Sequence, residues 1–270
     1  MPPASLRVFP SPAAIGEDVA QRLLHRIELA RLSGKSFLLG CPTGRTPRPV
    51  YHALARELSN SRQDMSHVVL VMMDEYLVPG ESGLRYAPAA NEWSCHYFAR
   101  IEIAGKLNDE LPPSHRLPAK SIWFPEPGDP DAYDARIHDE GGIDFSILAS
   151  GASDGHVAFN PPGSSRDSIT RIIQLAEDTR RDNLLTFPAF ETLASVPSHG
   201  ISVGIATIAS AREAVMIVWG AGKRRSLARM MGTNGYDPMW PATVIHECPR
   251  GEILADADAA DEILPGRLEL

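Results

Sequence analysis

The first long pattern along the chain is helical. Apolar residues recur at every fourth position from Ile15 to Ile27, with mostly polar residues between them. This spacing places one apolar stripe along an α-helix. Ser11 followed by Pro12 is a typical helix start, and Gly34 is a typical stop. The pattern therefore predicts an amphipathic helix near the start of the chain.

Short apolar runs without alternating polar residues follow this helix, at 36–40, 68–73, 143–150 and 214–220. Parallel strands that helices cover on both faces have this composition. Helical patterns occupy the intervals, through Leu54 and at about 91–103, 129–138 and 222–232. Strands that alternate with helices predict an α/β protein, with a three-layer Rossmann-like fold and a mostly parallel central sheet.

The Pro-rich stretch from Leu111 to Pro130 is the best candidate for a linker between domains. Strand-like runs of the same style resume on both sides of it. We therefore interpret the stretch as a surface excursion, and we predict a single domain over residues 1–270.

Composition and charge narrow the range of partners. The chain has 26 Lys and Arg against 34 Asp and Glu, which gives a net charge of -8 and a pI near 5.6. No global basic field attracts nucleic acid or an anionic membrane. Three cysteines at irregular spacing indicate reduced thiols. The sequence shows neither a secretory signal nor an apolar run long enough to span a bilayer. We expect a cytoplasmic protein that binds neither nucleic acid nor membranes.

Polar residues directly after the apolar runs carry most of the functional information. Ligands of a parallel α/β sheet bind beyond the carboxyl ends of its strands. The loop 42–47 offers Thr43, Gly44, Arg45 and Thr46. Its amides, hydroxyls and guanidinium at a helix N-terminus suit a phosphate. An ordinary turn between a strand and a helix looks similar, so this signal is weak when taken alone.

Charged residues follow two further runs. Asp74 and Glu75 come directly after 68–73, and adjacent carboxylates on extended backbone point to opposite sides, so at most one of them should face a ligand. Lys223 follows 214–220 and opens a helix, where the helix dipole disfavours a cation unless an anion compensates it. For the two carboxylates the alternative interpretation is a capping or salt-bridging role. For Lys223 it is a solvated basic turn.

The glycine-rich loop 151–165 carries the strongest signal. Asp154 and His156 are separated by one glycine and can form a carboxylate–imidazole pair that fixes the histidine tautomer for acid–base chemistry. No set of residues at zinc-ligand spacing is present in this loop. A structural or capping histidine is the alternative interpretation.

Taken together and in this order, the segments resemble the glucosamine-6-phosphate deaminase family. Its members are also called glucosamine/galactosamine-6-phosphate isomerases, and they share a fold with the 6-phosphogluconolactonases. The resemblance covers about residues 11–263, and the combination of MDEY with DGHVAFN is specific. Tyr76 and the sequence after the histidine are nearer to the deaminases than to the lactonases. The matching strings are PTGRTPRPVY (42–51), MDEY (73–76), DGHVAFN (154–160), EDTR (177–180) and GKRRSLAR (222–229).

The resemblance implies a role for each candidate residue. Asp74 would move a proton between C2 and C1 of the sugar, and His156, oriented by Asp154, would open the pyranose ring. Lys223 and the loop 43–46 would hold the phosphate. The implied reaction is aldose–ketose isomerisation with loss of the 2-amino group as ammonia. It requires neither a metal nor an organic cofactor.

Two positions depart from the family's pattern. Pro161 stands where the deaminases usually carry a glutamate that completes an Asp-His-Glu relay, and Leu185 stands where they usually carry a phosphate-binding arginine. Arg45 is our candidate replacement for that guanidinium. Because a proline ring cannot accept a proton, we expect weak ammonia release from glucosamine 6-phosphate and better turnover of another phosphorylated sugar.

Two other functions stay open at this point. A 6-phosphogluconolactonase-like hydrolase would need only His156, as a base toward water. A non-catalytic sugar-phosphate-binding protein would keep the pocket without turnover. In each case we expect a small-molecule sugar phosphate as the partner, and we expect the protein to be a homo-oligomer.

Overall fold

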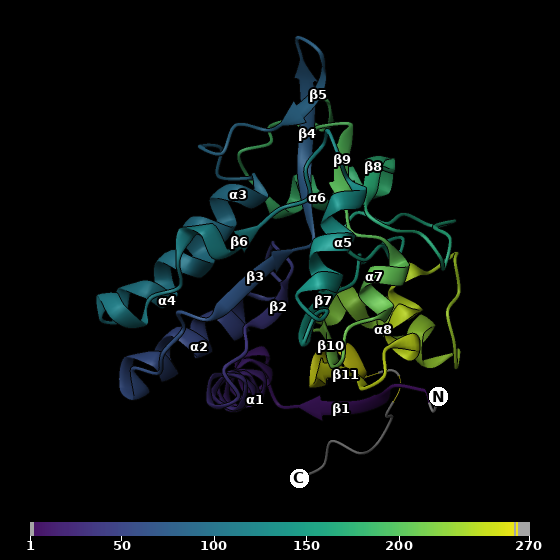
Figure 1. Cartoon of the computed structure of the whole chain (residues 1–270). Helices are drawn as coiled ribbons and strands as arrows, with labels where there is room; N and C mark the ends of the chain where they lie inside the picture. The colour runs from purple at the N-terminus through teal and green to yellow at the C-terminus, as the bar shows by residue number, and fades with distance from the viewer. Residues whose placement is uncertain (1–2, 262, 264–270) are drawn as a thin grey trace.

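The computed structural model describes residues 3–261 and 263, and it contains two β-sheets. The larger sheet has seven strands, and every neighbouring pair in it is parallel (Figure 1). This confirms the predicted parallel central sheet. In spatial order its strands are β1 (Ser5–Phe9), β11 (Gly251–Asp256), β10 (Ala214–Val218), β7 (Phe145–Ala149), β2 (Phe37–Cys41), β3 (Val68–Met72) and β6 (Ile122–Trp123).

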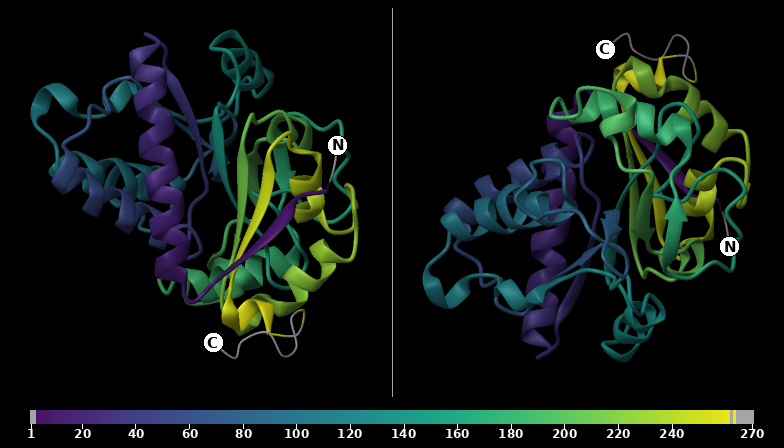
Figure 2. Two further views of the ribbon diagram at one scale, coloured as in Figure 1. Left: turned by 90° about the horizontal axis from the view of Figure 1, so that it is seen from below. Right: turned by 90° about the horizontal axis from the view of Figure 1, so that it is seen from above.

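Helices cover both faces of this sheet, as the two views of Figure 2 show. Successive strand residues point to opposite faces, so Leu38 joins one apolar cluster and Leu39 joins the other. Each cluster is completed by helices from its own side, which confirms the three-layer fold. Residues of α1 (Pro12–Leu32), α2 (Arg48–Ser61), the π-helix Phe98–Gly105 and α4 (Lys106–Asp109) pack on one face, and residues of α5 (Asp131–Asp139), α7 (Ile205–Ala209) and α8 (Arg224–Met231) pack on the other.

The helix α1 forms as its sequence pattern predicts. The Ser11 hydroxyl accepts a hydrogen bond from the amide of Ala14 at 3.2 Å, so it caps the first turn. The apolar stripe from Ile15 to Ile27 is fully buried against the sheet. Ser33 follows the last turn, and Gly34 has a φ of 64°, a conformation that glycine adopts readily.

The smaller sheet is antiparallel, and the sequence patterns did not predict it. It forms the upper part of the molecule in Figure 1 and continues directly from the central sheet, because β3 ends at Met72 and β4 begins at Asp74. Its strands are short and lie far apart in the sequence, so no single window shows a clear pattern. In spatial order they are β5 (Gly83–Tyr86), β4 (Asp74–Gly80), β9 (His199–Ser202) and β8 (Arg171–Gln174).

The structure corrects two predicted segments. The stretch 111–130 is not only a surface excursion, because Ile122 and Trp123 form the edge strand β6 beside β3. The helix predicted at 91–103 begins at Cys95 and continues to Asp109. The remaining helical elements are α3 (Cys95–Tyr97), α6 (Glu177–Thr186), α9 (Ala257–Ala260) and 3₁₀ turns at Pro113–His115, Ala119–Ser121, Leu193–Ser195, Ala221–Lys223 and Pro241–Glu247.

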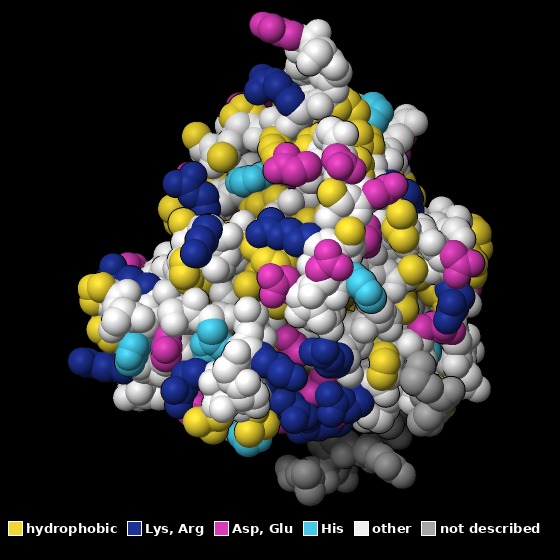
Figure 3. Space-filling model, viewed as in Figure 1, with side chains coloured by type: hydrophobic (Ala, Val, Ile, Leu, Met, Phe, Trp, Pro, Cys, Tyr) yellow, Lys and Arg dark blue, Asp and Glu magenta, His cyan; other side chains and the backbone are white. Residues whose placement is uncertain are grey.

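The surface carries charges of both signs. Figure 3 shows Lys and Arg side chains gathered near α1 at the bottom of the view, with Asp and Glu among them. On α1, Arg22 and Arg26 both pair with the buried Glu213, at 2.8 and 2.9 Å. These cations are therefore neutralised locally.

Within the described residues, no helix is both long enough and apolar enough to cross a membrane.

The loop after β7 is anchored to the smaller sheet by one buried side chain. The Nδ2 atom of Asn160 donates to the carbonyl oxygens of Val157 at 3.1 Å and Val203 at 2.8 Å, and Asn160 is fully buried. This side chain therefore holds the loop against the end of β9.

We expect Asn160→Ala to lower the free energy of unfolding by about 1–3 kcal/mol, because it removes two buried hydrogen bonds of the Asn160 side chain. Urea unfolding measures the change. Asn60→Ala on α2 is the control, because Asn60 is exposed and bonds only to a carbonyl one turn away. Equal effects of the two substitutions would show that the anchor contributes nothing.

Candidate active site

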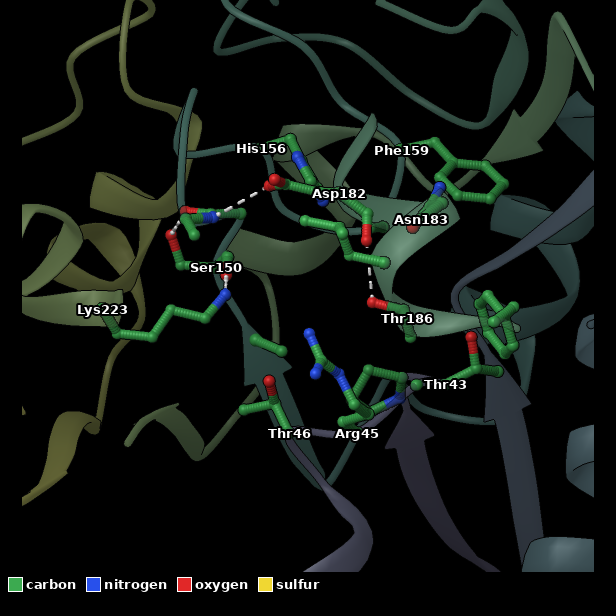
Figure 4. A pocket seen from close by; sticks show the side chains of 18 of the residues that line it. Thr43, Arg45, Thr46, Ser150, His156, Phe159, Asp182, Asn183, Thr186 and Lys223 are labelled. Carbon is green, nitrogen blue, oxygen red and sulfur yellow. Dashed lines mark hydrogen bonds between the residues drawn. The ribbon is translucent and has the colours of Figure 1, made fainter. Parts of the chain in front are cut away.

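A cavity of about 330 Å³ lies at the carboxyl ends of β10, β7, β2 and β3, which are consecutive neighbours in the central sheet. The sequence-predicted segments follow these same strands, so the topology brings them together (Figure 4). Asp154 stands behind the imidazole of His156 and does not itself line the cavity. The predicted residues that line it are Thr43, Gly44, Arg45, Thr46, Asp74, His156 and Lys223.

Asp74 lies at the junction of the two sheets and is only 6% exposed. Burial raises the pKa of its carboxyl group from 3.8 to about 7. A hydrogen bond from Cys95 opposes this rise, the charge of Glu75 adds to it, and His156 opposes it. A carboxylate with a pKa near 7 is a stronger base than an exposed one and is still available in its ionised form at neutral pH.

Glu75 points away from the cavity and is fully buried. Its carboxylate accepts hydrogen bonds from the backbone amides of Cys95 at 3.0 Å and His96 at 2.8 Å, and it lies 2.6 Å from Nδ1 of His96. Glu75 therefore holds the start of α3. The alternation of side chains along the strand separates the two neighbouring carboxylates, as the sequence predicts.

Asp154 and His156 form the predicted pair. The Nδ1 atom of His156 lies 2.7 Å from Oδ1 of Asp154, and the Thr179 hydroxyl donates to Oδ2 of Asp154 at 2.8 Å. Burial alone would raise the pKa of Asp154, but the hydrogen bonds and charge of His156, together with the hydrogen bond from Thr179, outweigh it and hold that pKa well below its ordinary value. A Cβ atom at Gly151 would lie 2.3 Å from Nδ1 of His156. Only glycine therefore leaves room for the pair.

Two cations enter the cavity from different strands. Lys223 donates a hydrogen bond to the carbonyl oxygen of Ser150. Burial lowers the pKa of Lys223. The charge of Asp182 raises this pKa, that of Arg45 lowers it and that of Asp154 raises it. Figure 4 shows the side chains of Lys223 and Arg45 both extending into the cavity.

The loops that carry these cations are tied together. The indole nitrogen of Trp219 donates to the carbonyl oxygen of Thr46 at 3.0 Å. Leu185 also lines the cavity, and it is 73% exposed. Leu185, which replaces the family's usual arginine, therefore lies in the site itself. Among the described residues, the Lys and Arg side chains that line the cavity are those of Arg45 and Lys223.

Sequence reasoning missed two residues that touch this site. The three cysteines are free and buried, but the Cys95 thiol also donates to Oδ1 of Asp74 at 3.2 Å. Asp182 on α6 lines the cavity, and its Oδ2 atom accepts from the amide of Ala152 and the hydroxyl of Ser153. Neither residue follows a predicted strand, so no signal drew attention to them.

The residues of this site fit acid–base chemistry better than metal binding. One potential ligand atom from each of Asp154, His156 and Asp182 lies within 4.8 Å of the other two. Nδ1 of His156 is already engaged by Asp154. A metal ion bound by all three groups would either displace this hydrogen bond or bind His156 through the other ring nitrogen.

The fold and site define an α/β protein with an acid–base cluster and a cationic loop at the carboxyl ends of parallel strands. The family model described as glucosamine-6-phosphate isomerases/6-phosphogluconolactonase matches residues 10–254. The chain belongs to this family. It is 31% identical to a glucosamine-6-phosphate deaminase of Shouchella clausii over 253 residues, which are 91% of this chain and 92% of that protein. It is 33% identical to a glucosamine-6-phosphate deaminase of Dictyostelium discoideum over 256 residues, with 92% and 89% coverage.

Solved structures share the fold. One described as a monomeric glucosamine-6-phosphate deaminase has a TM-score of 0.79 at 22% identity, and the match covers 95% of this chain and 99% of that one. A 6-phosphogluconolactonase from Trypanosoma brucei has a TM-score of 0.67 at 17% identity, with 98% and 100% coverage. The family resemblance and the three-layer fold read from the sequence are confirmed.

The raised pKa of Asp74 predicts a pH-dependent effect on stability. Because the pKa in the folded state, about 7, exceeds the reference value of 3.8, the folded protein holds the proton more tightly than the unfolded chain. Ionisation of Asp74 therefore lowers stability as the pH rises from about 4 through about 7.

We expect Asp74→Asn, which cannot ionise, to stabilise the protein more at about pH 8 than at about pH 5, by on the order of 1–3 kcal/mol. Denaturant unfolding at both pH values measures this difference. Asp178→Asn on the exposed side of α6 is the control. A stability gain that does not change with pH would contradict the assigned pKa.

Proposed function

We propose that the protein is a sugar-phosphate aldose–ketose isomerase that acts on a 2-amino-2-deoxyhexose 6-phosphate and releases ammonia. One observation carries the proposal: a buried carboxyl group with a pKa of about 7, that of Asp74, lines the same cavity as His156, which is paired with Asp154. The family membership and the names of the relatives support the same reaction.

In the proposed reaction each acid–base group has a separate task. His156, held in one tautomer by Asp154, transfers the proton from O1 to O5 and opens the sugar ring. Asp74 then removes the proton from C2 and returns it to C1, while O1 gains a proton and the amine nitrogen loses one. This converts the C2 amine into an imine, which water hydrolyses to the ketose and ammonia. A positioned acid or base contributes roughly 10²–10⁴-fold to such a step.

The phosphate would lie between Lys223 and the loop Thr43–Thr46. Two cations in one cavity repel each other, and a bound dianion relieves that repulsion. Arg45 supplies a guanidinium where the family's arginine is replaced by Leu185. We therefore assign Arg45 and Lys223 to the phosphate and Asp74 and His156 to the sugar.

The test is a panel of hexosamine, hexose and pentose phosphates with 6-phosphogluconolactone, in which ammonia, ketose and acid release are measured. We expect ammonia and ketose from a hexosamine phosphate, with glucosamine 6-phosphate the weaker substrate if Pro161 slows ring opening. We expect Asp74→Asn to lose roughly 10²-fold or more in turnover while binding persists. Asp178→Asn is the matched control.

The other outcomes of the panel separate the competing functions. Acid release from the lactone, with most activity kept in Asp74→Asn, would replace the isomerase by a hydrolase in which His156 activates water. Binding without any product would favour a sugar-phosphate-binding protein. Ketose without ammonia would indicate an isomerase whose substrate is a phosphorylated sugar without a 2-amino group.

We infer that residues 1–270 act as one domain, because the cavity draws residues from β2, β3, β7 and β10 and the family model spans 10–254. A cytoplasmic location fits a sugar-phosphate substrate. Self-association stays a prediction, and a related solved structure is described as monomeric.

Lys223→Ala and Arg45→Ala should each raise KM for a phosphorylated substrate roughly tenfold or more and lower kcat less, because both cations interact with a non-reacting group. Affinity should also fall with salt. Lys120→Ala, which removes a cation outside the cavity, is the control. An unchanged KM in Arg45→Ala would show that the missing guanidinium is not replaced from this loop.

A further inference from the structure

Asp182 is an acidic residue in a cavity that we assign to an anionic substrate. It lies on α6 and points into the cavity beside His156 in Figure 4. Its Oδ2 atom accepts hydrogen bonds from the amide of Ala152 at 3.1 Å and from the hydroxyl of Ser153 at 3.0 Å. These bonds tie the carboxylate to the loop that carries His156 and fix where its negative charge sits.

The charge of Asp182 is close to the imidazole. A carboxylate oxygen of Asp182 lies within 4.8 Å of both a ring nitrogen of His156 and an oxygen of Asp154. Within the described residues, Asp182 forms no hydrogen bond to His156, and Nε2 of His156 has no hydrogen-bond partner. The interaction between the two groups is therefore electrostatic, and it leaves Nε2 available to a substrate.

We propose that Asp182 is a positioning residue for His156, a second carboxylate that stabilises the protonated imidazole while it transfers a proton. This inference rests on the acid–base role proposed for His156. The carboxylate comes from α6, whereas Pro161, in the loop after β7, offers none and does not line the cavity. With Asp182 in this role, Pro161 no longer predicts slow ring opening.

Other charged groups face the same histidine and lysine. Asp154 is bonded to Nδ1 of His156, and the charges of Asp74 and His156 interact. Lys223 interacts with Asp182, Asp154 and Arg45. Two cations and three carboxylates thus share the site, and the competing explanation is that Asp182 only balances Lys223.

The two explanations predict opposite effects of Asp182→Asn. An asparagine retains an acceptor oxygen for Ala152 and Ser153 and removes only the charge. If Asp182 supports His156, kcat falls roughly tenfold or more, and the acid–base profile of kcat moves. If Asp182 only balances Lys223, the substitution strengthens phosphate binding, so KM falls and kcat is kept.

A measurement that does not need turnover separates this inference from the proposed function. NMR follows the imidazole signal of His156 against pH in the intact protein, in Asp182→Asn and in the control Asp178→Asn, which removes the same charge from an exposed position on α6. We expect the titration midpoint in Asp182→Asn to move to lower pH, because a nearby negative charge is lost, and the control to leave it in place.

The outcomes are distinct. A midpoint that moves only in Asp182→Asn supports the inference, whether or not the substrate panel yields ammonia. A midpoint that stays in place in Asp182→Asn, or kinetics in which only KM falls, overturns it and leaves the proposed function standing. A midpoint that moves equally in both variants would reflect net charge alone and also overturns it.

Discussion

The site depends on the burial of one carboxylate where the chain passes from the parallel sheet into the antiparallel one. Met73 is the only residue between β3 and β4. Its carbonyl accepts the amide of Val203 at 2.9 Å, and Asp74 pairs with Ser202 of β9. The backbone of Asp74 is therefore fixed by hydrogen bonds at the junction of the two sheets. Burial of this fixed group raises its pKa to about 7, and Glu75, on the other side of the same strand, holds the start of α3.

The loop after β7 is constrained in a comparable way. Gly151 leaves the space that the Asp154–His156 pair occupies, and Asn160 ties the end of the loop to the smaller sheet. Thr179 reaches Asp154 from α6, and Asp182 reaches the start of the loop from the same helix. The acid–base pair is thus held from two sides. A movement of α6 would alter the surroundings of His156 together with the wall of the cavity.

Much of this arrangement could be predicted from local sequence signals. The apolar runs located β2, β3, β7 and β10, and the polar residues directly after them converge because those strands are neighbours. The smaller sheet could not be predicted, since β8 and β9 are four residues long and pair only through tertiary structure. Cys95 and Asp182 escaped notice for the same reason: Cys95 contacts Asp74 and Asp182 lines the cavity, each from a helix whose position relative to the sheet is set by packing. The strand β6 was hidden in a Pro-rich segment, where only Ile122 and Trp123 pair with β3.

The central claim is that Asp74, buried at the junction, carries a proton between two carbon atoms of the substrate. Turnover of an active substrate from the panel in deuterated water, followed by mass spectrometry and NMR of the product, tests it most directly. Since a carboxyl group exchanges its proton with solvent, the account predicts deuterium at C1 of the ketose product. Product formation and deuterium at C1 that both persist at the normal rate in a chain that carries Asp74→Asn would contradict it.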